Sequence, residues 1–326
     1  MYKLKSLLKK VRRRLIKPKP AELPKELLAE YRLDAERYNR FAIPVGGNER
    51  FRRLTGMQLD AAATRQYHRI EKGFSLPTPK HPFGRARSRR ALNNMFNRQK
   101  VPLPTEGIFL EEARAAVDGL DAWNNEQIFS EHSAPRGDSL PTNPLDPETL
   151  ATFITSRHSV RNFAPEKLDH ALVEEAVRLA SYAPSVCNRQ SWRVYYYDDP
   201  VEIAYILEIH AGSLGFQKQV PGLFIVTYDI RAFEDSLERN QGWIDGGLFS
   251  MNLLLALHGL GLGAVALNWS RRNYSTVELR KRADLPEHNN VVMMVAAGHL
   301  GPEYRVARSA RRPVSEILRY GKSTPS

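Results

Sequence analysis

Hydrophobic positions in the second half of the chain recur first at helical and then at strand-like spacing. Residues 170–182 carry an apolar stripe of helical period, and Asp169 is placed to cap that helix. The same pattern predicts helices at 147–156, 245–258 and 276–283, and strands at 193–198, 223–229, 264–269 and 291–298. The last strand is continuously apolar, which is typical of a strand covered on both faces. These elements predict an α+β domain in which helices flank a central mixed β-sheet.

Two short motifs mark helix ends within this domain. The glycine run GLGLGA, residues 259–264, has the spacing of a dinucleotide-binding turn. That turn needs a strand before the glycines and a helix after them, whereas here a helix precedes and a strand follows. We therefore interpret these glycines as a left-handed cap that ends the helix. Ser275 and Glu278 have the spacing of a capping box, which would begin the helix at 276–283.

The first half of the chain is less regular, and its role is unknown at this stage. Residues 21–129 are expected to be mainly helical, and residues 66–90 contain the prolines and glycines of a loop. His68, Glu71 and Lys72 could form a polar site there, although such a cluster is more often structural. Residues 130–147 have the composition of a linker, so the second domain is expected to comprise residues 148–326.

Charge is distributed unevenly along the 326 residues. The chain has 48 Lys and Arg against 36 Asp and Glu, and 28 of the basic residues fall in the first 150 positions. Residues 1–20 contain nine basic residues, no acidic one and a leucine stripe of helical period. This segment could contact an anionic membrane surface or an acidic partner, or it could be a solvated tail. Aromatic residues are sparse in it, so nucleic-acid binding is not expected.

Several classes of site and location can be set aside from composition. Cys187 is the single cysteine, which excludes an intramolecular disulfide and suits a reducing compartment. We therefore expect a cytoplasmic protein, which would be peripheral to the membrane if residues 1–20 dock there. We expect its thiol to be buried and inert rather than catalytic. No zinc-binding spacing, phosphate loop or nucleophile elbow occurs. The apolar stretch 244–267 is interrupted by polar residues and glycines, so we expect a buried helix and strand instead of a membrane span.

Four segments that lie far apart along the chain are better explained as one set of motifs than as separate features. They are SRHSVRNF (156–163), APSVCNRQSW (183–192), GLGLGAVALNW (259–269) and RSARRP (308–313). In order and spacing they resemble the FMN-dependent nitroreductase family, across about residues 150–320. The chemistry is compatible, because arginine suits the bidentate binding of a phosphate group.

The resemblance implies an intertwined homodimer with an FMN site at each subunit interface. It assigns no catalytic side chain and no metal, since the flavin carries the redox chemistry. NADH or NADPH is the implied electron donor, and an electron-poor or conjugated small molecule is the implied acceptor, in ping-pong order. Carried over by motif, the residues that would hold FMN are Arg157, His158, Ser159, Arg161, Pro184, Ser185, Asn188, Lys218, Ala266, Leu267, Asn268, Arg308 and Arg311.

The chain departs from the family pattern at two places. Ser191 replaces a proline, and Asn268 with Trp269 replaces an acidic residue and a glycine found in many relatives. A tryptophan there could narrow the space over the flavin, which leaves the substrate and general nitroreductase activity open. Two alternatives therefore stand beside the general oxidoreductase. One is a specialised flavin enzyme for a dedicated biosynthetic intermediate, and the other is a docking protein with a degenerate flavin fold.

Overall fold

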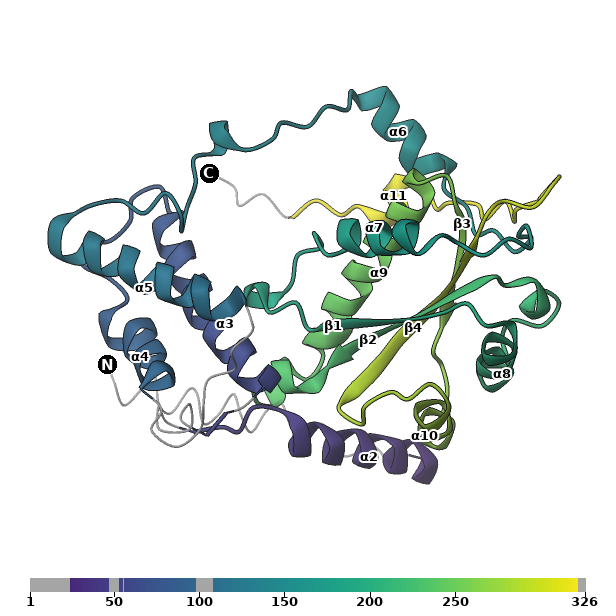
Figure 1. The fold of residues 1–326 in the computed structure, drawn as a ribbon, viewed down its shortest axis with the longest axis horizontal. Coiled ribbons are helices and arrows are strands. Elements are labelled where there is room, and N and C mark those ends of the chain that lie inside the picture. The colour runs from purple at the N-terminus through teal and green to yellow at the C-terminus, as the bar shows by residue number, and fades with distance from the viewer. Residues whose placement is uncertain (1–23, 47–52, 55, 98–107, 322–326) are drawn as a thin grey trace.

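The computed structural model describes residues 24–46, 53–54, 56–97 and 108–321 of the chain (Figure 1). The basic segment 1–20, with the docking role expected for it, lies outside the described residues. Among those described, no helix has both the length and the apolar character needed to cross a membrane.

One four-stranded sheet forms the centre of the C-terminal domain. Its strands are β1 (Trp192–Tyr197), β2 (Gly222–Asp229), β3 (Gly263–Asn268) and β4 (Asn289–Gly298). Their order across the sheet is β1-β2-β4-β3, and each neighbouring pair is antiparallel. Ser159 adds a parallel bridge to Ala264 on β3, which gives the sheet a mixed character. All eight residues of β2 are buried, as expected for a strand with a neighbour on each side and a helical layer on each face.

Helices cover both faces of this sheet (Figure 1). On one face α7 (His170–Ala180) and α9 (Gln241–Gly259) pack through Val173, Phe249 and Leu253 against Phe224 and Val295. On the other face the helices are α8 (Pro200–His210) and α10 (Asn273–Arg282), which contribute Ile203, Leu207 and Leu279 to a second core. The expected α+β class, with a central sheet flanked by helices, is confirmed.

The N-terminal region is helical, as expected, and it shares a core with the C-terminal domain. Its helices are α2 (Lys25–Phe41), α3 (Gly56–Phe74), the π-helix η2 (Arg85–Arg89), α4 (Arg90–Phe96) and α5 (Ile108–Glu126). Their buried cluster includes Leu59, Ile70 and Leu120. It also includes Tyr228, near the end of β2, and Phe233, which comes a few residues after β2. The two regions are therefore joined by buried hydrophobic contacts as well as by the chain.

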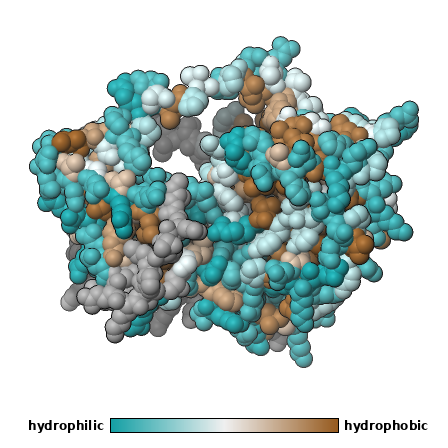
Figure 2. Space-filling model, viewed as in Figure 1, coloured by the Kyte–Doolittle hydropathy of each residue, from teal (hydrophilic) through white to brown (hydrophobic). Residues whose placement is uncertain are grey.

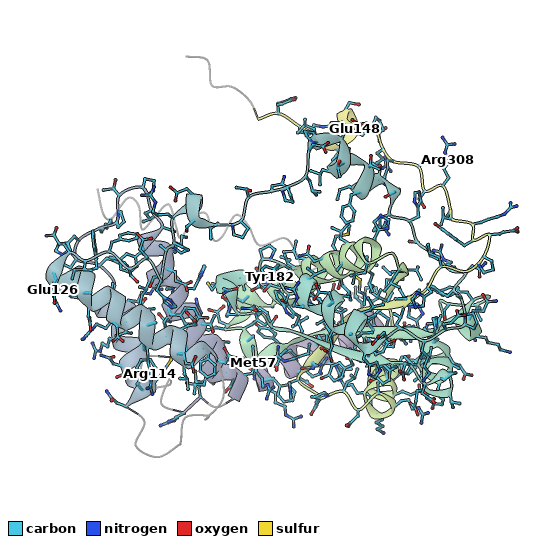
Figure 3. The ribbon with its side chains drawn as sticks, turned by 45° about the horizontal axis from the view of Figure 1, so that its top comes forward. Met57, Arg114, Glu126, Glu148, Tyr182 and Arg308 are labelled. Atoms are coloured by element: carbon cyan, nitrogen blue, oxygen red, sulfur yellow. The ribbon has the colours of Figure 1, made fainter. Side chains whose placement is uncertain are left out.

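Two peripheral segments stand away from the body of the molecule (Figures 1 and 2). Residues 135–146 are exposed, connect the two regions and contain the short turn η3 (Gly137–Ser139) before α6 (Pro147–Ser156) begins, whereas Phe129 and Ala134 before them still pack against the N-terminal core. Residues 302–321, which include the short helix α11 (Val314–Ile317), are all exposed. Arg308 lies far from the sheet on this C-terminal segment (Figure 3). The remaining short turns are η4 (Val186–Asn188), η5 (Gln217–Gln219), η6 (Ile230–Ala232) and η7 (Ser236–Glu238).

The structure confirms two of the expected helix caps and corrects two other predictions. Asp169 accepts a hydrogen bond from the Ala171 amide at the start of α7, and Gly261 adopts a left-handed φ of 76° just after α9. The expected loop at 66–90 is wrong in its first part, because α3 continues to Phe74 with its apolar face buried. The capping box is also wrong: α10 begins at Asn273, and Ser275 is a buried residue inside the helix.

Candidate functional site

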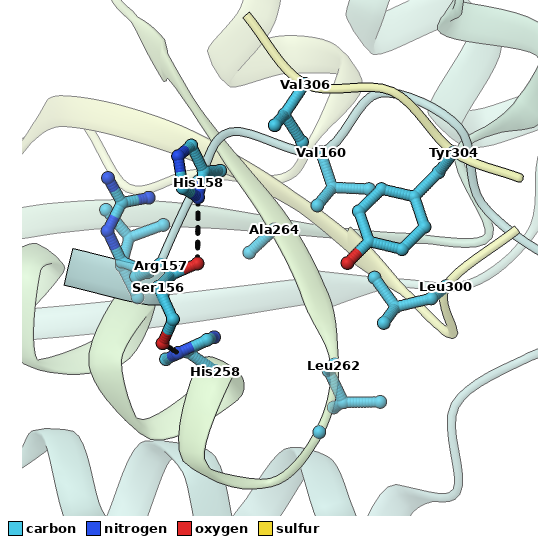
Figure 4. Close-up of a pocket in the computed structure, with 12 residues that line it drawn as sticks. Ser156, Arg157, His158, Val160, His258, Leu262, Ala264, Leu300, Tyr304 and Val306 are labelled. Carbon is cyan, nitrogen blue, oxygen red and sulfur yellow. Dashed lines mark hydrogen bonds between the residues drawn. The ribbon is translucent and has the colours of Figure 1, made fainter. Parts of the chain in front are cut away.

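A small cavity lies beside the parallel bridge at the outer edge of the sheet (Figure 4). Its volume is about 160 Å³, and α6, α9, β3 and the C-terminal segment all contribute to its wall. The residues that line it are Ser156, Arg157, His158, Val160, Leu254, His258, Gly261, Leu262, Ala264, Leu300, Tyr304 and Val306. Segments up to 150 residues apart in the sequence therefore meet here.

Hydrogen bonds fix the polar side of this cavity (Figure 4). The His158 ring Nδ1 lies 2.8 Å from the Ser156 carbonyl, so Nδ1 carries the proton and donates. The Ser156 hydroxyl lies 2.9 Å from Nε2 of His258, which links the end of α6 to α9. No hydrogen bond or ion pair to Arg157 is found within the described part of the chain. Its guanidinium is thus available to a ligand.

The cavity is cationic in character. No Asp or Glu is among its lining residues, whereas Arg157, His158 and His258 all are. Burial lowers the pKa of His258, and the charge of Arg157 lowers it further. His258 is therefore held neutral next to a permanent cation. Such a set of donors without a carboxylate suits an anion, and phosphate above all.

The strand next to the cavity presents small residues outward. Ala266 and Asn268 are exposed on β3, while Leu267 between them is buried in the opposite core. The carbonyl of Asn268 accepts a hydrogen bond of 3.0 Å from Nε2 of His210. Because Nδ1 of His210 accepts from the Gly212 amide, its neutral tautomer is fixed, and burial lowers its pKa. A buried histidine thus holds this end of β3 in place, which the sequence did not indicate.

Trp269 does not lie on the exposed face of β3. Its ring packs against the core under α8 and α10, and its indole nitrogen donates to Oγ1 of Thr276 at 3.0 Å. Ala266 and Asn268 project to the other side of the strand. The expected narrowing of a flavin site by this ring therefore has no support in the fold.

The second motif lies at the opposite edge of the sheet, before β1. Pro184 and Asn188 are exposed there, and the Ser185 hydroxyl accepts a hydrogen bond of 3.0 Å from the Gln190 amide. Cys187 and Asn188 both have left-handed φ angles, of 50° and 54°. Cys187 is half-buried, so the expectation of a buried thiol is wrong. Since β1 and β3 are separated by β2 and β4, one chain does not bring this motif together with Ala266.

A buried arginine that the sequence did not single out holds this second motif in shape. The side chain of Arg189 is 0% exposed and forms two hydrogen bonds with the Glu238 carboxylate, at 2.9 and 3.0 Å. It also donates to the carbonyls of Val186 and Ala232. On the other side, the Val186 amide donates to the buried carboxylate of Asp245 on α9. The loop around η4 is therefore rigidly anchored.

The remaining predicted site residues are solvent-exposed and lie apart. Arg161 follows the cavity and reaches the Ser159 carbonyl at 3.5 Å. Lys218 is exposed in η5. Arg308 and Arg311 belong to the exposed C-terminal segment, and Arg311 bonds to the carbonyl of Ser309. The structure thus groups Arg157, His158 and Ser159 with β3 and leaves these four outside that group.

An exposed hydrophobic stripe runs along α9, between the two motifs. Ile244, Leu248 and Met251 are 54%, 42% and 43% exposed, and they recur at helical spacing. Other hydrophobic side chains of α6 and the C-terminal segment are also exposed, and hydrophobic residues gather over this part of the surface in Figure 2. Contiguous exposed hydrophobic surface of this kind marks a site of protein association.

Comparison with known proteins confirms the resemblance seen in the motifs. Residues 154–229 match the model of the nitroreductase family. A protein from Methanothermobacter thermautotrophicus, provisionally named NADH dehydrogenase/NAD(P)H nitroreductase, is 28% identical over 137 residues, which cover 41% of this chain and 69% of that protein.

Solved structures give matches of the same kind. A provisionally named nitroreductase from Desulfovibrio desulfuricans, in complex with FMN, is 26% identical with a TM-score of 0.46, covering 57% of this chain and 100% of that one. A provisionally named NADH dehydrogenase/NAD(P)H nitroreductase from Parabacteroides distasonis is 23% identical with a TM-score of 0.47, covering 54% of this chain and 100% of that one.

Proposed function

We propose that this chain, whose residues 154–229 belong to a nitroreductase-family domain, is an FMN-dependent NAD(P)H oxidoreductase that works as a homodimer. The observation that carries the proposal is the acid-free cavity in which the guanidinium of Arg157 lies beside His158 and His258, next to the exposed side of β3. When bound, FMN would supply the redox chemistry: a hydride from NADH or NADPH would be taken up first and then, in ping-pong order, passed to an electron-poor or conjugated small molecule.

The residues at the cavity would hold the anionic end of the cofactor. Arg157 has a free guanidinium there, and the backbone bridge of Ser159 to β3 fixes its position relative to the strand. Arg161 follows the cavity in sequence and would add positive charge near the phosphate group, whereas Arg308 and Arg311 lie apart from it and would contribute only if the exposed C-terminal segment packed against a partner copy. The hydrogen bond from His158 to the Ser156 carbonyl leaves its Nε2 free to accept a hydrogen bond from a ribityl hydroxyl.

The exposed side of β3 would support the flavin ring. Ala266 offers little bulk, so a planar ring can approach the strand closely, and Leu267 keeps the strand anchored in the core. Asn268 would provide a polar contact at the ring edge, and His210 holds its backbone in register. Lys218 is the candidate for a further cationic contact near the ring.

Two features favour a second copy of the chain as part of the site. The cavity of about 160 Å³ is smaller than the roughly 300–1,000 Å³ of pockets that enclose a ligand of this size. In addition, Pro184, Ser185 and Asn188 lie at the sheet edge opposite β3, so only a partner copy could bring them to the flavin. The exposed stripe on α9 and the exposed C-terminal segment are the surfaces that such a partner would cover.

Flavin binding by purified protein tests the first part of this proposal. The wild-type chain is expected to retain FMN or to bind it on addition, with the visible absorbance of a bound flavin. Arg157→Gln removes a charge-assisted contact worth about 1.5–3 kcal/mol, so the Kd for FMN should rise at least about tenfold. The matched control is Arg178→Gln, because Arg178 is exposed on α7 and pairs with Glu175, away from the cavity. A wild-type protein that takes up no FMN would refute the cofactor assignment.

Sedimentation analysis tests the homodimer. Leu248→Lys places a charge in the middle of the α9 stripe and should give a monomer that binds FMN poorly. Val201→Lys is the control, since Val201 is 71% exposed on α8, on the other face of the sheet. A wild-type protein that is monomeric at micromolar concentration and still binds FMN tightly would contradict the shared site.

A further inference from the structure

A second, larger groove lies between the N-terminal helix α2 and helix α10. Its volume is about 740 Å³, within the roughly 300–1,000 Å³ typical of small-molecule sites. It shares no residue with the cavity at Arg157. The residues that line it are Leu33, Glu36, Arg37, Arg40, Asn273, Tyr274, Val277, Arg280, Lys281, Leu285 and Glu287.

Two arginines lie side by side in the wall of this groove. Arg280 donates through Nη2 to the Asn289 carbonyl at 2.9 Å, and Arg37 reaches the same oxygen at 3.5 Å. Arg37 also donates to the Glu287 carbonyl at 2.9 Å. Because both guanidinium groups converge on one carbonyl oxygen, two positive charges are held close together.

Neither arginine has its hydrogen-bonding capacity met by the described residues. Arg280 is only 8% exposed, and the Nε atoms of both Arg37 and Arg280 are buried without a hydrogen-bond partner in the described part of the chain. A buried donor without a partner is costly. A role in attaching α2 to α10 accounts for the Nη2 contacts, but it leaves these Nε donors and the close like charges unexplained.

The electrostatics of the groove also favour a bound anion. Burial and, after it, the charge of Arg37 lower the pKa of Arg280 to about 10, so the two arginines repel each other. The nearby carboxylates of Glu287 and Asp34 oppose this effect only in part. Glu287 is shared with Arg40, which bonds to it at 3.0 Å, while Lys281 adds another positive charge. An anion between the two arginines would relieve the repulsion.

We propose that the groove between α2 and α10 binds a small organic phosphate, with its phosphate group on Arg37 and Arg280. Two adjacent guanidinium groups match the charge and the acceptor oxygens of a phosphate monoester. Leu33, Val277 and Leu285 supply an apolar wall for the organic part, which inorganic phosphate would not use. Since Arg37 belongs to α2 and Arg280 to α10, the ligand would also tie the N-terminal helix to the C-terminal domain.

Calorimetric titration of the full chain, saturated with FMN so that the flavin site is filled, tests this inference. The probes are phenyl phosphate, inorganic phosphate and phenol. Phenyl phosphate should bind with a Kd at least tenfold lower than inorganic phosphate, inorganic phosphate should compete with it, and phenol should not bind measurably. Phenol binding as tightly as phenyl phosphate, or the absence of phenyl phosphate binding at millimolar concentration, would overturn the proposal.

Single substitutions show which residues bind phenyl phosphate. Arg37→Gln and Arg280→Gln should each raise the Kd for phenyl phosphate at least tenfold, and either one is sufficient if the other does not fold. Arg282→Gln is the matched control, because Arg282 is on the same helix but pairs with Glu202 outside the groove, and it should leave the Kd unchanged. If Arg157→Gln abolishes phenyl phosphate binding while Arg37→Gln does not, the phosphate occupies the flavin cavity and the inference is wrong.

Discussion

The buried pair of Arg189 and Glu238 should be a large contributor to the stability of this protein. Replacing Arg189 with Met keeps a long apolar side chain but removes every donor of the guanidinium group. The carbonyls of Val186 and Ala232 then lose their partners, and the Glu238 carboxylate, which is 18% exposed, loses its principal counter-ion. Breaking a buried ion pair from one side typically costs about 3–5 kcal/mol.

The structure places the expected cost at the lower end of that range. Glu238 keeps two other partners in the variant, because it accepts a hydrogen bond of 2.7 Å from the Glu234 amide and lies 4.0 Å from Arg65. We therefore expect Arg189→Met to lower the free energy of unfolding by about 3 kcal/mol at pH 7, measured by urea titration. Arg178→Met is the control, since its ion pair with Glu175 lies at the surface and its loss should not shift the urea midpoint measurably.

A double variant and a pH series show whether the lost charge pairing is the cause. Glu238→Gln keeps an acceptor for the Glu234 amide and removes the unpaired charge, so adding it to Arg189→Met should restore part of the stability. Burial raises the pKa of Glu238, but Arg189, with smaller help from the Glu234 amide and Arg65, holds it below the ordinary 4.5. The pair thus stabilises the fold above that pH and less as pH falls, so the deficit of Arg189→Met should shrink in acid. A deficit no larger than that of Arg178→Met, or one unaffected by Glu238→Gln, would refute this account.

Three further predictions concern single contacts. Gly242→Ala on α9 should lower the free energy of unfolding, measured by urea titration, by about 1–3 kcal/mol, because the added Cβ would lie 2.3 Å from the buried ring of Tyr228. Gly137→Ala is the control, since its Cβ would meet no atom within 4 Å and should leave the free energy of unfolding unchanged. Burial lowers the pKa of His210, so on acidification the unfolded chain takes up a proton before the folded chain does, and the free energy of unfolding falls as the pH drops below 6.5. His210→Gln keeps one donor and one acceptor but does not titrate. Its free energy of unfolding should therefore fall less steeply between pH 7 and 5. Asp199→Ala should cost about 1 kcal/mol in thermal or urea unfolding, because Asp199 caps α8 by accepting from Val201 and Glu202, while Asp199→Asn should cost less.

Elements with strong local signals were predicted well from the sequence. β4 was recognised from a continuous apolar run and β2 from its strand-like pattern, and both agree with the expected ranges to within a few residues. The cap at Asp169 and the glycine after α9 were also local signals, since each depends on residues next to it. Arg157 and His158 lie near β3, whereas the motif before β1 and the one at 308–313 lie apart from them in the single chain, so the predicted flavin site stays a prediction.

Features that depend on distant contacts could not be predicted in this way. Arg189 is a charged residue in a polar loop, and only its contacts with residues 43 and 49 positions later make it buried. His210 likewise owes its role to a carbonyl 58 positions away. The end of α3 was missed for another reason: its buried face at Ile70 and Phe74 keeps the chain helical until just before the proline and glycine signals of the following loop.

The N-terminal helices acquire a structural role from these long-range contacts. α3 lies against η4, the turn that contains Cys187, and Val186 of that turn packs against the N-terminal core. The same core encloses Tyr228 and Phe233, and Arg189 stacks over the Phe233 ring at 5.1 Å. A chain beginning at residue 148 would therefore expose these aromatic side chains and release one side of η4. The described helices of the N-terminal region thus support the loop that carries Ser185 and Asn188, even though none of the family motifs lies within them.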